Sequence, residues 1–121
     1  MPIQSILVVD DSPTDRQHLT NILAKRGYKV FTAESAEEAL ALVTQLQPDL
    51  VLMDVVLPGQ NGFQATRELS KSAATKHIPV IICTTKGQET DKVWGMRQGA
   101  RDYIVKPVSP VDLQAKIQAL G

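Results

Sequence analysis

The chain has 121 residues, 43% of them hydrophobic and 21% charged, and its 13 Lys and Arg residues balance its 13 Asp and Glu residues. This length and composition predict one soluble globular domain and argue against a second. A formal net charge of zero argues against a general nucleic-acid-binding protein, which is usually strongly basic.

In the first half of the chain, short apolar runs alternate with helical patterns. Residues 5–9 (SILVV) predict a strand covered on both faces, and Ser12-Pro13 predicts an N-cap followed by the first residue of a helix. Residues 29–33 (KVFTA) predict a weaker strand, and a capping box at residues 35–38 (SAEE) predicts the start of a second helix. Residues 50–53 (LVLM) predict a third strand, again covered on both faces.

The second half repeats this alternation. Asn61-Gly62 precedes a third helix, and residues 80–83 (VIIC) predict a fully covered fourth strand. The polar stretch 88–98 predicts a helix with little to bury, and residues 102–105 (DYIV) predict another weak strand. Ser109-Pro110 again combines a cap with a proline and favours a final helix, although the apolar residues after it also alternate with a period of two.

This order of elements predicts an α/β fold. Five strands alternating with five helices imply a parallel sheet with helices on both faces. For a short chain we expect the flavodoxin-like (βα)5 doubly wound sheet with strand order 2-1-3-4-5. No linker or repeat divides residues 1–121, which we interpret as a single domain.

Several classes of protein are excluded by features that the sequence lacks. The single cysteine, Cys83, excludes an intrachain disulfide, and its place in an apolar run indicates a buried thiol. The longest apolar runs have about five residues, whereas about 20 are needed to cross a bilayer. No secretory leader is visible, so we expect a cytoplasmic protein with no membrane partner.

The strongest functional signal is a group of three carboxylates. In the predicted strand order, ligands bind beyond the carboxyl ends of the first and third strands, where the order reverses. Asp10 and Asp11 follow the first strand, and Asp54 follows the third. Three carboxylates repel one another, and a hard cation such as Mg2+ would relieve the repulsion. The alternative is that these acids only cap the helices that follow.

Two complementary groups follow the remaining strands. Thr84 ends the fourth strand and Lys106 follows the fifth, so a hydroxyl and a cation are expected at the same rim. A carboxylate nucleophile, metal ligands, a hydroxyl and a cation are what phosphoryl transfer to Asp54 requires. A cis peptide before Pro107 is a further possibility for aiming Lys106 inward.

The segments VVDDS, LVLMDVVLPGQNG, VIICTT and DYIVKP resemble the signature blocks of the response-regulator receiver family over essentially the whole chain. The resemblance implies a CheY-like switch rather than an enzyme with an ordinary turnover, phosphorylated by a histidine kinase in the presence of Mg2+. It implies the following roles: Asp54 as phosphoacceptor, Asp10, Asp11, Asp54 and the carbonyl of Val56 as metal ligands, Thr84 as switch hydroxyl, Lys106 as the site lysine, and Tyr103 as the rotating aromatic residue.

A narrower resemblance lies in GFQATRELS and TTKGQETDKVWGMRQGARDYIVKPV. These segments are similar to receivers that act alone in the chemosensory control of type IV pili and twitching motility. The resemblance implies the histidine kinase of a chemosensory system as the phosphodonor.

With no output domain expected in residues 1–121, the chain must signal through its surface. We expect a monomer whose face built from residues 86–120 binds a protein partner, and in which Tyr103 moves inward after Thr84 on phosphorylation. The 88–98 helix, with only Val93, Trp94 and Met96 to bury, is the least anchored element and suits a switch. Trp94 is interpreted either as partly packed in the core or as a contact residue of that face.

The charge is divided unevenly along the chain. Residues 1–60 carry 4 basic and 8 acidic side chains, whereas residues 61–121 carry 9 basic and 5 acidic ones. Four of the basic residues lie on or near the expected binding face: Lys86, Lys92, Arg97 and Arg101. We therefore expect the partner surface to be acidic.

Three other functions are compatible with this fold class. A flavin-binding electron carrier needs a phosphate-cradling loop, but the loop after the first strand is the acidic DDSPTD. An aspartyl phosphatase commonly has an Asp-x-Asp pair, but Val55 and Val56 follow Asp54. The complete set of site residues argues against a receiver that works without phosphorylation, although this alternative stays open. The resemblance to the receiver family implies that Val56 and Lys86 occupy positions that tune dephosphorylation. Because valine cannot orient a water molecule, we expect slow loss of a phosphoryl group from Asp54.

Overall fold

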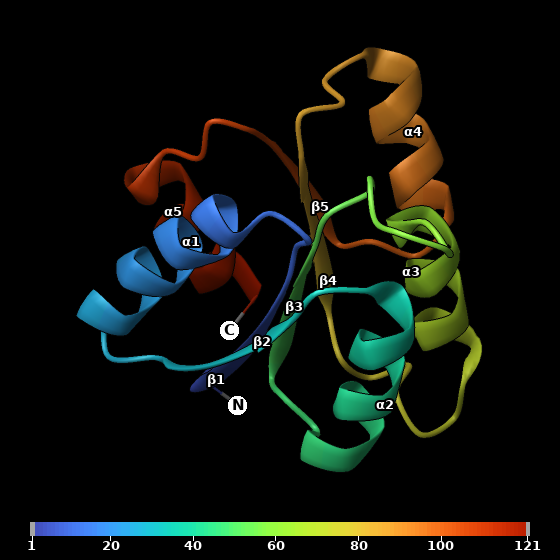
Figure 1. The fold of residues 1–121 in the computed structure, drawn as a ribbon, viewed down its shortest axis with the longest axis horizontal. Helices are drawn as coiled ribbons and strands as arrows, with labels where there is room; N and C mark the ends of the chain where they lie inside the picture. The colour runs from blue at the N-terminus through green and yellow to red at the C-terminus, as the bar shows by residue number, and fades with distance from the viewer. Residues whose placement is uncertain (1, 121) are drawn as a thin grey trace.

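The computed structural model describes residues 2–120 and contains a five-stranded parallel sheet with the order β2-β1-β3-β4-β5. Strands and helices alternate along the chain, which confirms the predicted fold (Figure 1). The elements are β1 (Ser5–Val9), α1 (Pro13–Lys25), β2 (Lys29–Ala33), α2 (Ala36–Leu46), β3 (Leu50–Met53), α3 (Gly62–Lys71), β4 (Val80–Thr84), α4 (Glu89–Arg97), β5 (Asp102–Val105) and α5 (Pro110–Leu120).

The sheet lies between two layers of helices. Helices α1 and α5 cover one face, and α2, α3 and α4 cover the other (Figure 1). Each layer has its own apolar core, because alternate side chains of the strands point to opposite faces. The three central strands β1, β3 and β4 are almost entirely buried, whereas β2 and β5 lie at the edges, as their weaker apolar patterns predicted.

Helix caps determine how the chain leaves each strand. The hydroxyl of Ser12 accepts a hydrogen bond from the backbone N–H of Asp15, and the helix begins at Pro13 as predicted. At α2 the capping box is shifted by one residue. The Ser35 hydroxyl accepts a hydrogen bond from the backbone N–H of Glu38, as expected. The Glu38 carboxylate, however, accepts from the N–H of Glu34 and not from that of Ser35. The final segment is a helix, so the cap and not the period-two pattern was the correct signal.

Helix α4 buries less than the sequence predicted. Its one buried residue is Gly95, while Val93, Trp94 and Met96 are exposed, with Trp94 at 50%. A Cβ atom added to Gly95 would lie 2.8 Å from Cδ1 of Ile82, so the backbone of α4 itself packs against the sheet at this point. This close approach leaves the large neighbouring side chains on the outside.

No helix within residues 2–120 has both the length and the apolar character needed to cross a bilayer. The cysteine prediction is confirmed, since Cys83 is a buried free thiol in β4. Burial raises the pKa of this thiol to about 12, so the protonated, unreactive form predominates.

Candidate functional site

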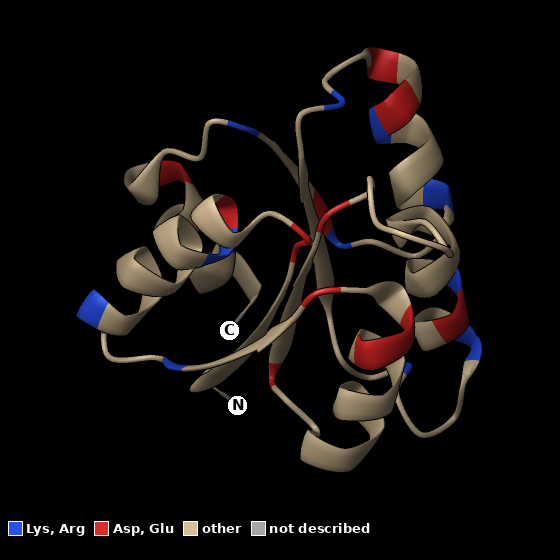
Figure 2. Ribbon diagram, in the orientation of Figure 1, with Lys and Arg blue, Asp and Glu red and all other residues tan. Residues whose placement is uncertain are grey.

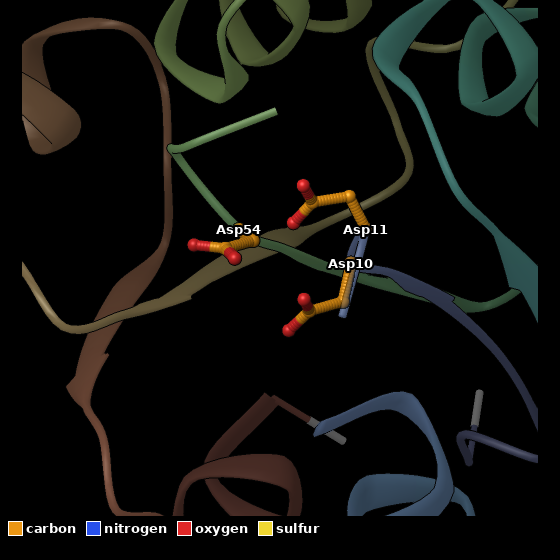
Figure 3. A group of neighbouring side chains, drawn as sticks. All are labelled: Asp10, Asp11 and Asp54. Atoms are coloured by element: carbon orange, nitrogen blue, oxygen red, sulfur yellow. The ribbon is translucent and has the colours of Figure 1, made fainter. Parts of the chain in front are cut away.

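The register of the central strands brings the predicted carboxylates together. Val9 of β1 pairs with Met53 of β3, and the backbone N–H of Asp54 donates a 3.0 Å hydrogen bond to the carbonyl of Val9. The residues that follow these two strand ends therefore lie side by side. Figure 3 shows Asp10, Asp11 and Asp54 projecting into the same space from β1 and β3.

The three carboxylates form one cluster at the carboxyl edge of the sheet. One oxygen from each of Asp10, Asp11 and Asp54 lies within 4.8 Å of the others. Asp10 is 1% exposed and Asp54 is 7% exposed, whereas Asp11 faces solvent. In Figure 2 this acidic region lies at the centre of the molecule, between the two helical layers. The oxygen ligands and their spacing fit a hard divalent cation such as Mg2+.

Lys106 brings a positive charge to the same cluster. The residue follows β5, its backbone N–H donates to the carbonyl of Thr84 at 2.8 Å, and its peptide bond to Pro107 is cis. Its Nζ atom lies 2.5 Å from Oδ2 of Asp10 and 3.3 Å from Oδ2 of Asp54. The structure thus places Lys106 beside Asp10 and Asp54.

Burial and charge act on Asp54 in opposite directions. Desolvation is the largest influence and raises the pKa of the Asp54 carboxyl, and the nearby charge of Asp10 adds to this effect. The charge of Lys106, the hydroxyl of Thr84 and the backbone N–H of Val55 lower it, but the net shift is upward. The N–H of Val55 donates to Oδ1 of Asp54 at 2.7 Å, which holds the carboxylate in one orientation.

Lys106 remains charged in this setting. Burial disfavours the ammonium form, but hydrogen bonds to Asp10 and Asp15 and the charge of Asp54 outweigh this effect and raise the pKa of Lys106 above its ordinary value. The site consequently combines the buried carboxylate of Asp54 with the permanently charged ammonium of Lys106.

Thr84 and Tyr103 lie on the neighbouring strands β4 and β5, and the Thr84 hydroxyl reaches the Asp54 carboxylate. Thr84 is completely buried at the end of β4, and its hydroxyl accepts a long 3.5 Å contact from the N–H of Lys86. Tyr103 of β5 is also buried, and its hydroxyl donates a 2.7 Å hydrogen bond to the carbonyl of Lys86. The tyrosine ring therefore already points inward in this structure. Whether phosphorylation changes its position stays a prediction.

The alternative interpretation of the acids as helix caps does not account for the cluster. Ser12 caps α1 through its hydroxyl, while Asp10 accepts from the N–H of Ser12 at 3.0 Å and also binds Lys106. Val56 lies in the loop after β3, with its side chain mostly exposed. Its assignment as a metal ligand through the carbonyl stays a prediction.

Two residues that contact this site were not predicted from the sequence. Asp15, in the first turn of α1, places Oδ2 2.9 Å from Nζ of Lys106. Arg16 donates to the backbone carbonyl of Asp10 at 2.8 Å and pairs with Glu34 at 3.0 Å. The Ser12 cap was the available signal, because it starts α1 beside the first strand and so brings the first turn to the rim of the site.

Comparison with known proteins agrees with this geometry. The model of the family described as response regulator receiver domain matches residues 6–118. Protein PilH of Pseudomonas aeruginosa is 59% identical over 115 residues, which cover 95% of this chain and 95% of that protein.

Solved structures show the same fold. A response regulator from Chloroflexus aurantiacus superposes with a TM-score of 0.93 at 33% identity, covering 99% of this chain and 98% of the other. The receiver domain of a sensor histidine kinase from Pseudomonas aeruginosa has a TM-score of 0.89 at 29% identity, covering 96% of this chain and 95% of the other. That domain was solved with a magnesium ion coordinated in its active-site cleft.

Proposed function

The chain belongs to the response regulator receiver domain family, and on this basis we propose that Asp54 accepts a phosphoryl group and thereby switches the surface of the domain. The observation that carries the proposal is the position of Asp54. Its carboxylate is buried, lies within 4.8 Å of those of Asp10 and Asp11, and lies 3.3 Å from the ammonium of Lys106.

In the proposed reaction, an oxygen of the Asp54 carboxylate attacks the phosphorus atom of the donor. The bond from phosphorus to the leaving atom of the donor breaks, the donor leaves with that electron pair, and an acyl phosphate forms on Asp54. Lys106 contributes a permanent positive charge that attracts the transferred oxygens, and the Thr84 hydroxyl donates a hydrogen bond to one of them. The ordering of Asp54 by the N–H of Val55 keeps the nucleophile aligned before the donor arrives.

The acidic cluster is the proposed magnesium site. Asp10, Asp11 and Asp54 supply carboxylate oxygens and Val56 its backbone carbonyl, a set of oxygen ligands that suits Mg2+. When bound, the ion supplies positive charge that offsets the developing charge on the phosphoryl oxygens. Without the metal ion, the three carboxylates would repel an anionic donor. Within residues 2–120, Lys106 is the one residue that forms an ion pair with Asp54.

A small phosphodonor tests this assignment. The wild-type protein, incubated with Mg2+ and acetyl phosphate, should gain one acid-labile phosphoryl group, and Asp54→Asn should gain none. Asp49→Asn is a matched control, since Asp49 lies at the opposite ends of the strands, where it accepts from the N–H groups of Gln4 and Ser5. Incorporation that persists in folded Asp54→Asn would refute the assignment.

The phosphodonor in the cell is proposed to be the histidine kinase of a chemosensory system that controls type IV pili and twitching motility. The support is the 59% identity with PilH, which extends over nearly the whole length of both proteins. Transfer of the phosphoryl group from purified candidate kinases, compared with acetyl phosphate under the same conditions, would identify the cognate one.

The output surface is proposed to be the face built from residues 86–120. Exposed apolar side chains on this face are Val93, Trp94, Met96, Val105 and Val111. The 50% exposure of Trp94 supports its interpretation as a contact residue. Because Lys86, Lys92, Arg97 and Arg101 lie on or near the same face, an acidic protein partner is expected.

Salt and a single substitution test this surface. Binding of a candidate partner to the phosphorylated protein should weaken with added salt, since exposed charges are screened over about 10 Å at 0.1 M. Trp94→Ala should weaken binding while leaving the free energy of unfolding nearly unchanged. Binding that depends on neither salt nor Trp94 would place the partner elsewhere.

A further inference from the structure

We propose that Asp15 is a positioning residue that holds the ammonium group of Lys106 and so competes with the phosphoryl site for it. This inference rests on the proposed role of Asp54. The Nζ atom of Lys106 lies 2.9 Å from Oδ2 of Asp15 but 3.3 Å from Oδ2 of Asp54. Asp15 therefore binds this ammonium more closely than the nucleophile does.

The hydrogen-bond capacity of Lys106 makes this a competition. An ammonium group has three N–H donors and no acceptor. In this structure three carboxylates take them up, those of Asp10, Asp15 and Asp54. The lysine side chain is 10% exposed, so solvent is a poor substitute for any of the three. For Lys106 to make a close contact with a phosphoryl group on Asp54, its bond to Asp15 must lengthen or break.

Asp15 is well placed to hold Lys106 reversibly. Its side chain is 43% exposed, in contrast to the buried Asp10, so its carboxylate can be hydrated when the ammonium leaves. A small cavity of about 70 Å3 adjoins the pair and is lined by Asp15, His18 and Leu19 of α1 and by Lys106, Pro107 and Val108 of the loop after β5. This space allows the lysine stem to shift without displacing the helix.

The role of Asp15 in folding is separable from its contact with Lys106. The backbone N–H of Asp15, and not its side chain, takes part in the α1 cap. An acidic side chain in the first turn also stabilises the helix by interacting with the positive end of its dipole, but this effect needs no contact with Lys106. Asp15→Asn keeps the shape and the cap and weakens the bond to the ammonium, because it removes the attraction between opposite charges.

A double-mutant cycle tests the proposal. We expect Asp15→Asn to raise the rate constant of phosphorylation by acetyl phosphate, at saturating Mg2+, by about three- to tenfold, which is within the coupling range of directly contacting residues. In a Lys106→Met background the same substitution should change the rate by less than about twofold. Asp15→Glu, which restores the carboxylate, should return the rate toward that of the wild type.

The cycle separates positioning from a general charge effect. If the removed charge merely eases the approach of an anionic donor, Asp15→Asn will accelerate the reaction equally in both backgrounds, and the proposal is wrong. Glu68→Gln is the control for net charge, since the Glu68 carboxylate belongs to no ion pair within residues 2–120. It should leave the rate unchanged.

A readout independent of phosphorylation completes the test. The 15N-detected signal of the Lys106 ammonium should shift in Asp15→Asn and recover in Asp15→Glu, with no donor present. An unchanged signal would overturn the proposal even if the rates change. If the wild type is not phosphorylated on Asp54 at all, the proposed function fails instead, while the ammonium signal still reports on the Asp15 contact.

Discussion

The hydroxyl of Tyr103 donates a 2.7 Å hydrogen bond to the backbone carbonyl of Lys86, which joins β5 to the loop after β4. Burial raises the pKa of Tyr103 to about 12, so the hydroxyl keeps its proton and this bond persists at neutral pH. The same loop follows Thr84, the last residue of β4, whose hydroxyl interacts with the Asp54 carboxylate. The bond therefore connects the proposed phosphorylation site to the face of α4.

Tyr103→Phe should remove this connection while keeping the packing of the ring. We expect the free energy of unfolding to fall by about 1 kcal/mol, the ordinary net value of one hydrogen bond. Amide hydrogen exchange in residues 85–88 should become faster, because the loop loses its tether to β5. Tyr28→Phe is a matched control, since the Tyr28 hydroxyl bonds to Gln114 at a distance from this loop. Unchanged exchange in Tyr103→Phe would show that other contacts hold the loop.

Val56 predicts a long lifetime for the phosphorylated protein. Its side chain is 56% exposed in the loop after Asp54 and has no polar atom with which to orient an attacking water. Val56→Asn should accelerate the loss of the phosphoryl group several-fold, by analogy with other gains from positioning a reactant. Leu46→Asn, at an exposed position on α2, should have no effect. The measurement is the decay of acid-labile phosphate after removal of the donor.

Asp54→Asn should stabilise the metal-free protein at neutral pH. Because the pKa of Asp54 is raised in the fold, mainly by burial, the unfolded chain loses this proton at lower pH than the folded chain. Folding stability therefore falls as the pH rises from the ordinary carboxyl pKa, about 3.9, through the raised value, and the loss persists above it. Urea unfolding at several pH values should show a gain for Asp54→Asn at pH 7 that vanishes near pH 3. A gain independent of pH would indicate another cause.

Gly62 is required where α3 begins. Its N–H donates to the carbonyl of Val55, and a Cβ atom added here would overlap the backbone carbonyl of Asp54. Backbone atoms cannot move aside as a side chain can, so Gly62→Ala should cost about 2 kcal/mol or more and reduce phosphorylation of Asp54. Gly95→Ala is the comparison, because its new Cβ would meet the side chains of Ile82 and Tyr103. Equal losses of phosphorylation in the two variants would show that the overlap at Asp54 is not decisive.

The local signals in the sequence were strong enough to determine the order of elements and the acidic cluster. Branched apolar runs predicted the central strands, and the alternation with capped helices predicted a parallel sheet, whose order 2-1-3-4-5 was expected from the flavodoxin-like fold class. Once that order is known, Asp10, Asp11 and Asp54 must meet, because the carboxyl ends of parallel strands lie along one edge. The helix after Ser109 could also be predicted, since a cap and a proline act on the backbone directly.

Only the tertiary structure decided which side chains pack and which pairs of charges meet. Trp94 and its neighbours face outward because the backbone of α4 approaches Ile82 at Gly95. This close approach between two elements cannot be predicted from the local sequence of α4. The contact between Asp15 and Lys106 joins residues 91 positions apart and depends on where α1 lies relative to the loop after β5. Local sequence fixes hydrogen bonding and capping within each element, whereas such contacts depend on how separate elements pack.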